Sequence, residues 1–411
     1  MAIEVREITE DADLRSAART DLASFGYAFD ETRFTKTLEA RRVATSYLAT
    51  DGDTPVGACM THGFDMTLPG GSTVAVSGVA DVGVLASHRR RGVLTEMMDR
   101  MLADSSAAGR VAAGLHASEA TIYGRFGFGA ATRHRKVSIA TSRASMRTGA
   151  AVAPGSVEVV HPEGRGDLLR EVHEQAMARR PGEVQRLDAH WNIRIAGDAS
   201  DESKMLCLVH RRPSGEPDAY ALYRIAADWA PAGPEHVLEV QELVAIDDAS
   251  ELAIWQAVLG LDLVATVISW VPRDSILFDA LEDRWAPHSI GEHDGLWLRV
   301  LDLPKMLAER RYRIPESLVL EVTDTRMPSG AITAGTWRIE VDHTGVASIG
   351  STSDSADLVL DVAELASVIL GGGSLARLAA VGLVTESTVG AARRGDALFG
   401  WWPTPWITEF F

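Results

Sequence analysis

The sequence predicts an α/β (α+β) chain with two similar domains and a third of different character. Three observations support this prediction. The order hairpin, strand, helix, strand occurs twice, which indicates a duplicated domain. Three consecutive arginines before a glycine join a strand to a helix in the first copy only. The last residues, 401–411, are largely apolar and aromatic. A chain of 411 residues ordinarily holds two or three domains, and we expect boundaries that give 1–150, 151–299 and 300–411.

In the first segment, the apolar pattern and turn residues predict strand, helix, hairpin, strand, helix, strand, helix. The first helix carries acidic residues in its first turn, as the helix dipole favours. A bulge or bend is expected at Ser77-Gly78, inside the long strand. The expected elements are a strand at 3–8, a helix at 11–24, a hairpin around 51–54, strands at 74–85 and 111–117, a helix from 93 to about 109, and a short helix carrying Tyr123.

The second and third segments give further elements. The glycines at 371–373 separate two helices of the third segment. The second segment predicts helices at 168–179 and 249–261 and strands at 205–210, 219–225, 237–246 and 265–270. The third predicts strands at 318–322 and 336–341 and helices at 363–370 and 375–381.

Acidic residues outnumber basic ones, 57 against 40, and give a formal net charge of −17. This balance disfavours nucleic acid and anionic membranes, because both need clustered Lys and Arg. It suits a cationic partner. The arginines at 89–91 are therefore better interpreted as a local anion site.

Two distant cysteines, Cys59 and Cys207, exclude a disulfide framework and favour a reducing cytoplasm. The start lacks an apolar signal region, and no apolar run is long enough to span a membrane. The histidines form no metal-binding motif, so no metal is expected. Cys59 has His62 nearby, but no third residue supports nucleophilic catalysis.

The stretch from Val82 to Leu94 carries the strongest chemical signal. A helix start leaves backbone N–H groups unpaired and bears partial positive charge, so it favours phosphate. Gly92 permits close approach, and arginines can donate two hydrogen bonds to phosphate oxygens. A solvated basic turn before a helix is the alternative. At the same place the second copy has Asp247 and Asp248, which cap a helix but repel phosphate.

These residues resemble the acetyl-CoA motif of GCN5-related N-acetyltransferases, Q/R-x-x-G-x-G/A, except that Leu94 stands at the last position. A more specific resemblance is to the Eis (enhanced intracellular survival) family of acetyltransferases. It rests on His88–Gly92, His116–Glu119, Ile122–Gly127 and a final aromatic residue, Phe411. The resemblance spans the chain and implies two acetyltransferase-like domains, a sterol-carrier-like third domain and a homohexamer.

The resemblance also implies roles for individual residues. Val82 and Val84 would bind the pantetheine arm of acetyl-CoA through their backbones. Ser118 would contact the cofactor, or simply cap the short helix. Arg91 would either contribute to binding of the pyrophosphate or point to solvent. The residues expected to hold the pyrophosphate are Arg89, Arg90, Gly92 and Val93.

Tyr123 is implied as the general acid, since a phenol with pKa near ~10 can protonate the departing thiolate. The alternative is a tyrosine packed with Phe126 and Phe128. The Phe411 carboxylate is implied as the general base, provided that burial raises its pKa above ~3.5. The alternative is a tail that only fills the core.

Acceptor contacts are expected from a loop after the first helix, which holds Phe25, Tyr27 and Phe34. Asp81 and Glu409 could attract a polycation. The family tends to have a bulky apolar residue where this chain has Asp81.

The expected function is acetyl transfer from acetyl-CoA to a primary amine of an aminoglycoside or another polycationic amine. Two alternatives stay open. One is acetylation of protein lysine or polyamines. The other is a non-enzymatic lipid or small-molecule carrier using the last domain, although the arginine-rich turn disfavours it.

Overall fold

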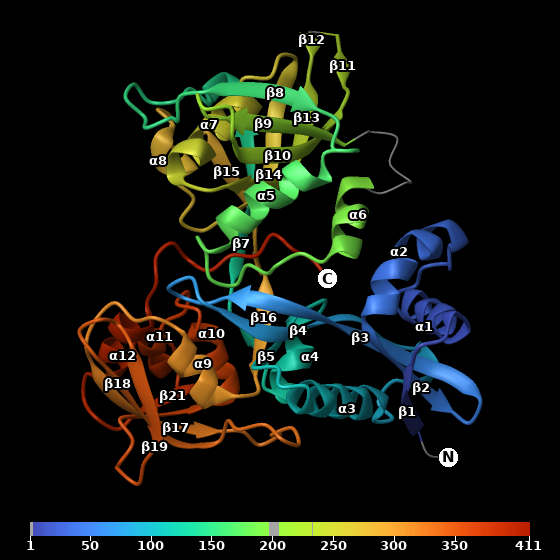
Figure 1. Cartoon of the computed structure of the whole chain (residues 1–411), viewed down its shortest axis with the longest axis vertical. Coiled ribbons are helices and arrows are strands. Elements are labelled where there is room, and N and C mark those ends of the chain that lie inside the picture. The colour runs from blue at the N-terminus through green and yellow to red at the C-terminus, as the bar shows by residue number, and fades with distance from the viewer. Residues whose placement is uncertain (1–2, 197–204, 232) are drawn as a thin grey trace. The chain divides into compact units, whose positions relative to one another are not determined.

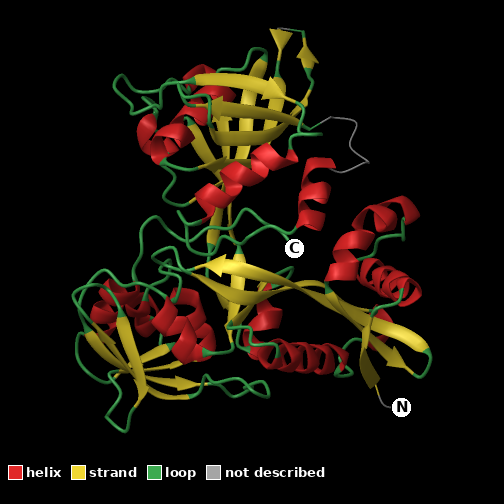
Figure 2. Ribbon diagram, viewed as in Figure 1, coloured by secondary structure: helices red, strands yellow, loops and turns green. Residues whose placement is uncertain are grey.

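A computed structural model describes residues 3–196, 205–231 and 233–411 of the chain. The chain divides into two compact units. The first unit contains residues 1–132, 181–189 and 294–411, and the second contains residues 133–180 and 190–293. Figure 1 labels the elements and Figure 2 shows their type.

The first unit is built on a mixed sheet in the order β1-β2-β3-β4-β5-β16-β6. Most neighbours are antiparallel, but β4 and β5 are parallel. The strands are β1 (Ile3–Ile8), β2 (Thr45–Asp51), β3 (Thr54–Thr67), β4 (Thr73–Val84), β5 (Ala112–His116), β6 (Gly129–Ala130) and β16 (Leu296–Val300). The helices of this part are α1 (Asp11–Ser24), α2 (Glu31–Val43), α3 (Val93–Ala107) and α4 (Ala120–Tyr123).

Helices cover both faces of this sheet, because successive side chains of a strand point to opposite faces. On β2, Leu48 packs with Leu14 of α1, whereas Tyr47 and Ala49 pack with Met97 of α3. The expected strands and helices of the first segment are present except that α2 replaces part of the expected loop.

The bulge lies elsewhere than expected. Gly78 pairs in register with His62, so Ser77-Gly78 is regular strand. The register shifts where Asp81 and Val82 stand opposite Cys59, between the pairs Ala58↔Gly83 and Met60↔Ala80. Asp81 has a positive φ of 51°, a conformation that aspartate tolerates better than most residues.

The third domain belongs to the first unit and has a five-stranded sheet, β19-β18-β17-β20-β21. Its apolar core is continuous with that of the first domain, since Leu298 of β16 clusters with Leu365 of α10. The elements are α9 (Leu303–Glu309), β17 (Ser317–Thr323), β18 (Gly335–Val341), β19 (Ala347–Ser351), β20 (Leu358–Asp361), α10 (Val362–Val368), α11 (Leu375–Ala380), β21 (Val384–Glu386) and α12 (Ala391–Phe399).

The second unit repeats the architecture with the sheet β15-β7-β14-β13-β10-β9-β8. Helix α7 starts at a capping box in which Asp247 and Ser250 bond each other's backbone N–H groups, as the aspartate predicted. The strands are β7 (Arg133–Ala140), β8 (Ser156–Val160), β9 (Leu206–Arg211), β10 (Pro217–Ala226), β13 (His236–Ala245), β14 (Val264–Pro272) and β15 (Pro287–Asp294), with a small pair β11 (Trp229–Ala230) and β12 (Gly233–Pro234). The helices are α5 (Gly166–Met177), α7 (Asp248–Leu259), α8 (Leu277–Ala280) and α6 (Asp188–Ala196), whose first two residues belong to the first unit.

Strand membership differs from the expected domain boundaries in two places. Strand β7 precedes residue 150 but pairs with β14 in the second sheet. Strand β16 precedes residue 300 but pairs with β5 and β6 in the first sheet. Hydrogen bonding within a sheet therefore moves these borders to about residues 132 and 293.

Candidate active site

Parallel strands β4 and β5 separate toward their carboxyl ends. Their pairing runs from Val76↔Ala112 to Val79↔Leu115. Past that point, β4 continues beside β3, and β5 continues beside β16. Within the described residues, the inner edges of β4 and β5 are not paired with each other beyond Val79, which leaves backbone groups for a ligand.

Val84 offers such groups. The N–H of Leu85 donates to the carbonyl of Val56 on β3, at 2.9 Å. Neighbouring residues of a strand direct their backbone groups to opposite edges, so the N–H and C=O of Val84 face away from β3. Val82 is the second residue of the bulge. Both valine side chains are half-buried in the cluster under α3.

The start of α3 is open. Gly92 is its N-cap residue, with φ of +87° and no side-chain cap. A Cβ at this glycine would meet no atom within 4 Å. The Val93 side chain is buried, which fixes the first turn. The unpaired N–H groups of a 15-residue helix therefore meet solvent beside exposed arginines.

The three arginines differ in their contacts. Arg89 donates from Nη2 to the carbonyl of Ser24, at 3.2 Å, and links the turn before α3 to the end of α1. Arg90 is exposed, with a positive φ of 62°. Arg91 lies 3.8 Å from the Asp51 carboxylate, which also lies 3.4 Å from His88. Arg91 therefore differs from Arg89 and Arg90 because it lies beside a carboxylate, that of Asp51.

Tyr123 ends helix α4 and is 5% exposed. Its ring packs edge-on against Phe128, with centroids 6.0 Å apart. Burial raises the pKa of the Tyr123 phenol, and a hydrogen bond from Ser118 acts in the opposite direction. The charge of Asp21 raises this pKa further. Ser118 precedes the N-cap residue Glu119 and so does not cap the helix.

The C-terminal tail, residues 400–411, is docked in the first unit. The Phe411 ring lies 5.1 Å from the ring of Phe64 and 5.3 Å from that of His116. His116 Nε2 lies 3.1 Å from the Glu409 carbonyl. Burial lowers the pKa of His116 to about 4, so its imidazole is neutral at pH 7. Ile407 is fully buried.

Residues 181–189 hold this tail. Arg186 pairs with the Glu409 carboxylate at 2.5 Å, and both side chains are almost fully buried. The Glu183 carboxylate accepts hydrogen bonds from the backbone N–H and the hydroxyl of Thr408. An ion pair and a hydrogen bond to the tail's backbone N–H thus hold the tail in place.

Two of the expected acceptor contacts need correction. Phe34 lies on α2, not in a loop, and packs in the core beneath α1. Glu409 is buried and neutralised by Arg186, so it offers no free charge to a polycation. Phe25 and Tyr27 do lie in an exposed loop, and Asp81 is partly exposed and pairs with Arg41 at 2.6 Å.

Sequence reasoning missed Asp21, His116 as a tail contact, and Arg186. Asp21 stands at an apolar position of α1 and is 6% exposed, so a charge on the inner face of an amphipathic helix was the available signal. Arg186 carried no such signal, because its partner is 223 residues away.

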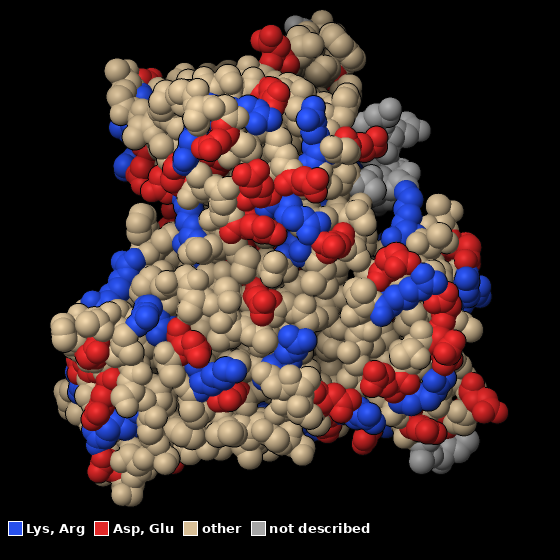
Figure 3. Space-filling model, viewed as in Figure 1, with Lys and Arg blue, Asp and Glu red and all other residues tan. Residues whose placement is uncertain are grey.

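Other candidate chemistry has less support. Burial raises the pKa of the Cys59 thiol to about 12, which disfavours a nucleophilic thiolate. Among the described residues, no cluster of His, Cys, Asp and Glu suits a metal ion, and none of the described helices is long and apolar enough to cross a bilayer. On the face shown in Figure 3, acidic and basic side chains are interspersed.

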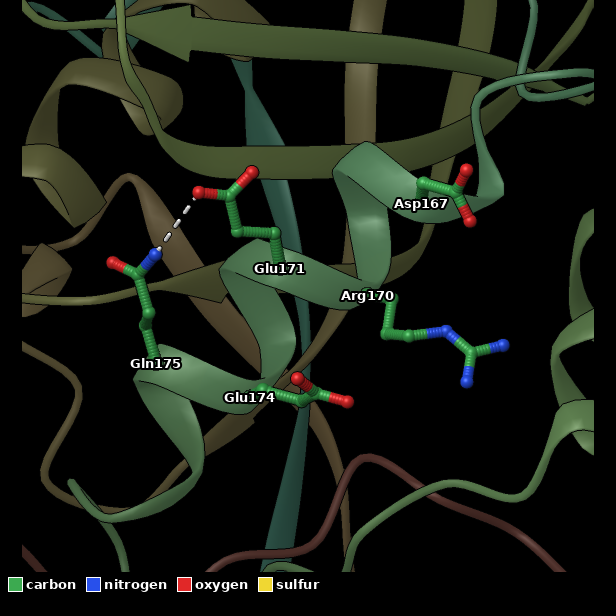
Figure 4. A pocket seen from close by; sticks show the side chains of 5 residues that line it. All are labelled: Asp167, Arg170, Glu171, Glu174 and Gln175. Atoms are coloured by element: carbon green, nitrogen blue, oxygen red, sulfur yellow. Dashed lines mark hydrogen bonds between the residues drawn. The ribbon is translucent and has the colours of Figure 1, made fainter.

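An open surface pocket lies along α5 in the second unit (Figure 4). Glu171 accepts a hydrogen bond from Gln175 at 3.4 Å on this helix. The lining is charged and solvent-facing, and comprises Asp167, Arg170, Glu171, Glu174 and Gln175.

Comparison with known proteins agrees with this architecture. Residues 4–131 and 182–339 match models of the acetyltransferase (GNAT) domain, and residues 303–408 match the sterol carrier protein domain. An uncharacterised N-acetyltransferase of Streptomyces griseus is 34% identical over the full length of both chains. The N-acetyltransferase Eis of Mycobacterium tuberculosis is 31% identical, over 85% of this chain and 84% of that protein.

Solved structures give the same result. The crystal structure of Eis1 from Mycobacterium abscessus has a TM-score of 0.86 and 29% identity, and covers all of both chains. A GCN5-related N-acetyltransferase from Anabaena variabilis, 17% identical, shares the fold with a TM-score of 0.84.

The fold and the domain matches define an acyltransferase of the GCN5-related class, with two such domains and a C-terminal sterol-carrier domain. Within that class, the chain belongs to the Eis-like family of N-acetyltransferases.

Proposed function

We propose that this protein transfers an acetyl group from acetyl-CoA to a primary amine, with one cofactor site per chain in the first domain. The observation that carries the proposal is the uncapped start of α3 at Gly92, beside exposed arginines and the unpaired edge of β4. Arg89, Arg90 and the backbone of Gly92 and Val93 would bind the pyrophosphate. Backbone groups of Val82 and Val84 would hold the pantetheine arm, with Ser118 near its end.

The second domain supports a single site. At the corresponding helix start, Asp247 caps the first turn of α7, and Arg179 pairs with Asp248 and Glu251. Asp247 satisfies the N–H of Ser250, and the three carboxylates Asp247, Asp248 and Glu251 outnumber their partners Arg179 and Arg212, so a pyrophosphate would be repelled.

Tyr123 would act as the general acid. The neutral amine nitrogen would attack the acetyl carbon, the carbon–sulfur bond would break, and the thiolate would take the phenolic proton. The proton that the nitrogen loses as the amide forms would return to the phenolate. Burial keeps Tyr123 protonated at neutral pH. The Phe411 carboxylate would accept the proton of the incoming ammonium. Its ring contacts with Phe64 and His116 hold that residue in place.

The acceptor we propose is a polycationic amine, such as an aminoglycoside or a polyamine, with protein lysine as the alternative. The net charge of −17 and the partly exposed Asp81 support a cationic acceptor.

A thiol-release assay tests the function directly. Acetyl-CoA is combined with kanamycin, spermidine or a lysine peptide, and free CoA is measured. We expect release with at least one of these amines and a higher Tm with acetyl-CoA. If acetyl-CoA at saturation shifts no Tm and releases no thiol, the cofactor assignment is wrong.

A chain extended by a few residues beyond Phe411 tests the carboxylate. We expect turnover to fall while acetyl-CoA still raises the Tm, and full activity of the extended chain would remove the carboxylate from the mechanism. We also propose a homohexamer in the cytoplasm. Sedimentation of the purified protein measures the first, and cell fractionation the second.

A further inference from the structure

Asp21 is a buried carboxylate that the proposed mechanism does not use. It lies in the last turns of α1 and is 6% exposed. Its Oδ1 accepts no hydrogen bond from any residue that the structure describes. This oxygen is aimed at β4, where it lies 3.0 Å from the position of a Cβ on Gly83. A buried acceptor without a donor is unusual, and a ligand can supply the donor.

The charges around Asp21 leave it short of a counterion. Asp81 stands at the bulge of β4 and holds Arg41 at 2.6 Å. Burial raises the pKa of Asp21 to about 7, and the Asp81 charge raises it as well. Arg41 and Arg33 of α2 act in the opposite direction but do not offset these effects.

Asp21 faces Gly83, which lies between Val82 and Val84, the two residues proposed to hold the pantetheine arm. Burial and the charges of Cys59 and Glu119 raise the pKa of Tyr123, and the charge of Asp21 adds a smaller effect in the same direction. The bulge beside it, Asp81-Val82, stands opposite Cys59, and Cys59 packs in the same apolar cluster as Tyr123.

We propose that Asp21 binds a second, non-reacting ammonium group of a diamine or polyamine acceptor. The inference rests on the proposed N-acetyltransferase function and narrows its substrate class. A carboxylate holds an ammonium in its charged form, whereas the nucleophile must be a neutral amine. The group bound by Asp21 is therefore an anchor, and another amine of the same molecule is acetylated.

Putrescine and n-butylamine test this assignment, because they differ by one terminal ammonium group. At pH 8 we expect wild-type kcat/KM for putrescine to exceed that for butylamine by about 10- to 100-fold, the range of a hydrogen bond to a charged group. In Asp21→Asn, the ratio falls toward unity. In the wild-type protein, the ratio also falls below about pH 7 as Asp21 becomes protonated.

Asp13→Asn is the matched control, since Asp13 lies on the same helix but pairs with Arg6 at the surface. We expect Asp13→Asn to keep the wild-type ratio of kcat/KM for putrescine to that for butylamine. If Asp21→Asn is poorly folded, the wild-type ratio measured between pH 5.5 and pH 8 tests the anchor instead, because protonation of Asp21 below about pH 7 lowers it. A preference for putrescine that survives both Asp21→Asn and the lower pH, or equal wild-type rates with the two amines, overturns the inference.

A binding measurement separates this inference from the proposed function. Putrescine raises the Tm of the wild-type protein more than butylamine does, and Asp21→Asn removes the difference. Equal Tm shifts in wild-type protein contradict the anchor even when thiol release is normal. Absence of any acetyl-CoA shift contradicts the proposed function instead.

Discussion

Tyr123 and Asp21 lie in the same unit, and burial raises the pKa of both. The consequences differ because the ordinary pKa values of the two groups, 3.8 for Asp and 10.0 for Tyr, lie on opposite sides of neutral pH. Tyr123 is kept as a neutral proton donor throughout the physiological range. Asp21 is moved into that range, so its charge depends on pH near 7. The same physical cause thus yields a constant donor and a titrating carboxylate.

Tyr123→Phe is expected to lower kcat by about 100-fold or more, the usual scale for loss of a general acid. Affinity for acetyl-CoA changes little, since the ring remains. Steady-state kinetics and an acetyl-CoA titration measure the two effects. Tyr47→Phe is the matched control, because it removes a hydroxyl from the same cluster, where Tyr47 bonds Asp104 at 3.1 Å. An unchanged kcat in Tyr123→Phe would exclude the acid role.

The raised pKa of Asp21 also predicts how the stability of the protein depends on pH. Its folded pKa of about 7 lies above the unfolded value of 3.8, so the folded state binds more protons between these values. Its contribution to stability is therefore present below about pH 4 and is lost as pH rises toward 7. Asp21→Asn removes this dependence. The Tm of the variant relative to wild type is expected to rise between pH 5 and pH 8, and an unchanged difference would contradict the raised pKa.

Among the elements, α3 and β4 form most of the proposed cofactor site. Helix α3 was predicted from its apolar face and its terminal glycines, and it occupies the expected range. Helix α2 was missed because only Phe34 and Ala40 are buried along its length, which leaves little periodicity to detect. The bulge of β4 was predicted at the wrong position. The glycine suggested Ser77-Gly78, but pairing with the partner strand β3 sets the register and places the bulge at Asp81-Val82.

The glycines at the two ends of α3 allow a paired test of the pyrophosphate site. Gly92 and Gly109 flank the helix, have φ of +87° and +74°, and face open space. An alanine at either position adds backbone strain of about 1–2 kcal/mol. Gly92→Ala is expected to lower the Tm and to weaken acetyl-CoA binding. Gly109→Ala lowers the Tm alone. Equal acetyl-CoA affinity in the two variants, measured by calorimetry, would speak against the pyrophosphate site at Gly92.

At the scale of the whole molecule, residues far apart in sequence build the first unit. Its sheet takes β16 from beyond the second domain, and residues 181–189 hold the C-terminal tail. Arg186 and Glu409 form one of the deeply buried links of this unit. Such a pair is costly to bury, and removing one partner leaves an unpaired charge in the interior.

Arg186→Leu is therefore expected to destabilise the protein by about 3–5 kcal/mol. The double variant Arg186→Leu/Glu409→Leu recovers much of that loss, because it removes both charges of the pair. Urea unfolding measures both. Limited proteolysis near residue 407 reports whether the tail is released. A single variant as stable as wild type would show that the ion pair does not hold the tail.

The sequence alone determined the fold class, the duplication, most helices and strands, and the family, because these depend on local periodicity and on short motifs such as Arg89–Gly92. The tertiary structure decided the placement of β7 and β16, the bulge at Asp81, the burial of Asp21 and the pairing of Arg186 with Glu409. These features arise from contacts between distant segments. Sheet register, burial and charge pairing depend on what packs against a residue, and no local pattern encodes that neighbour.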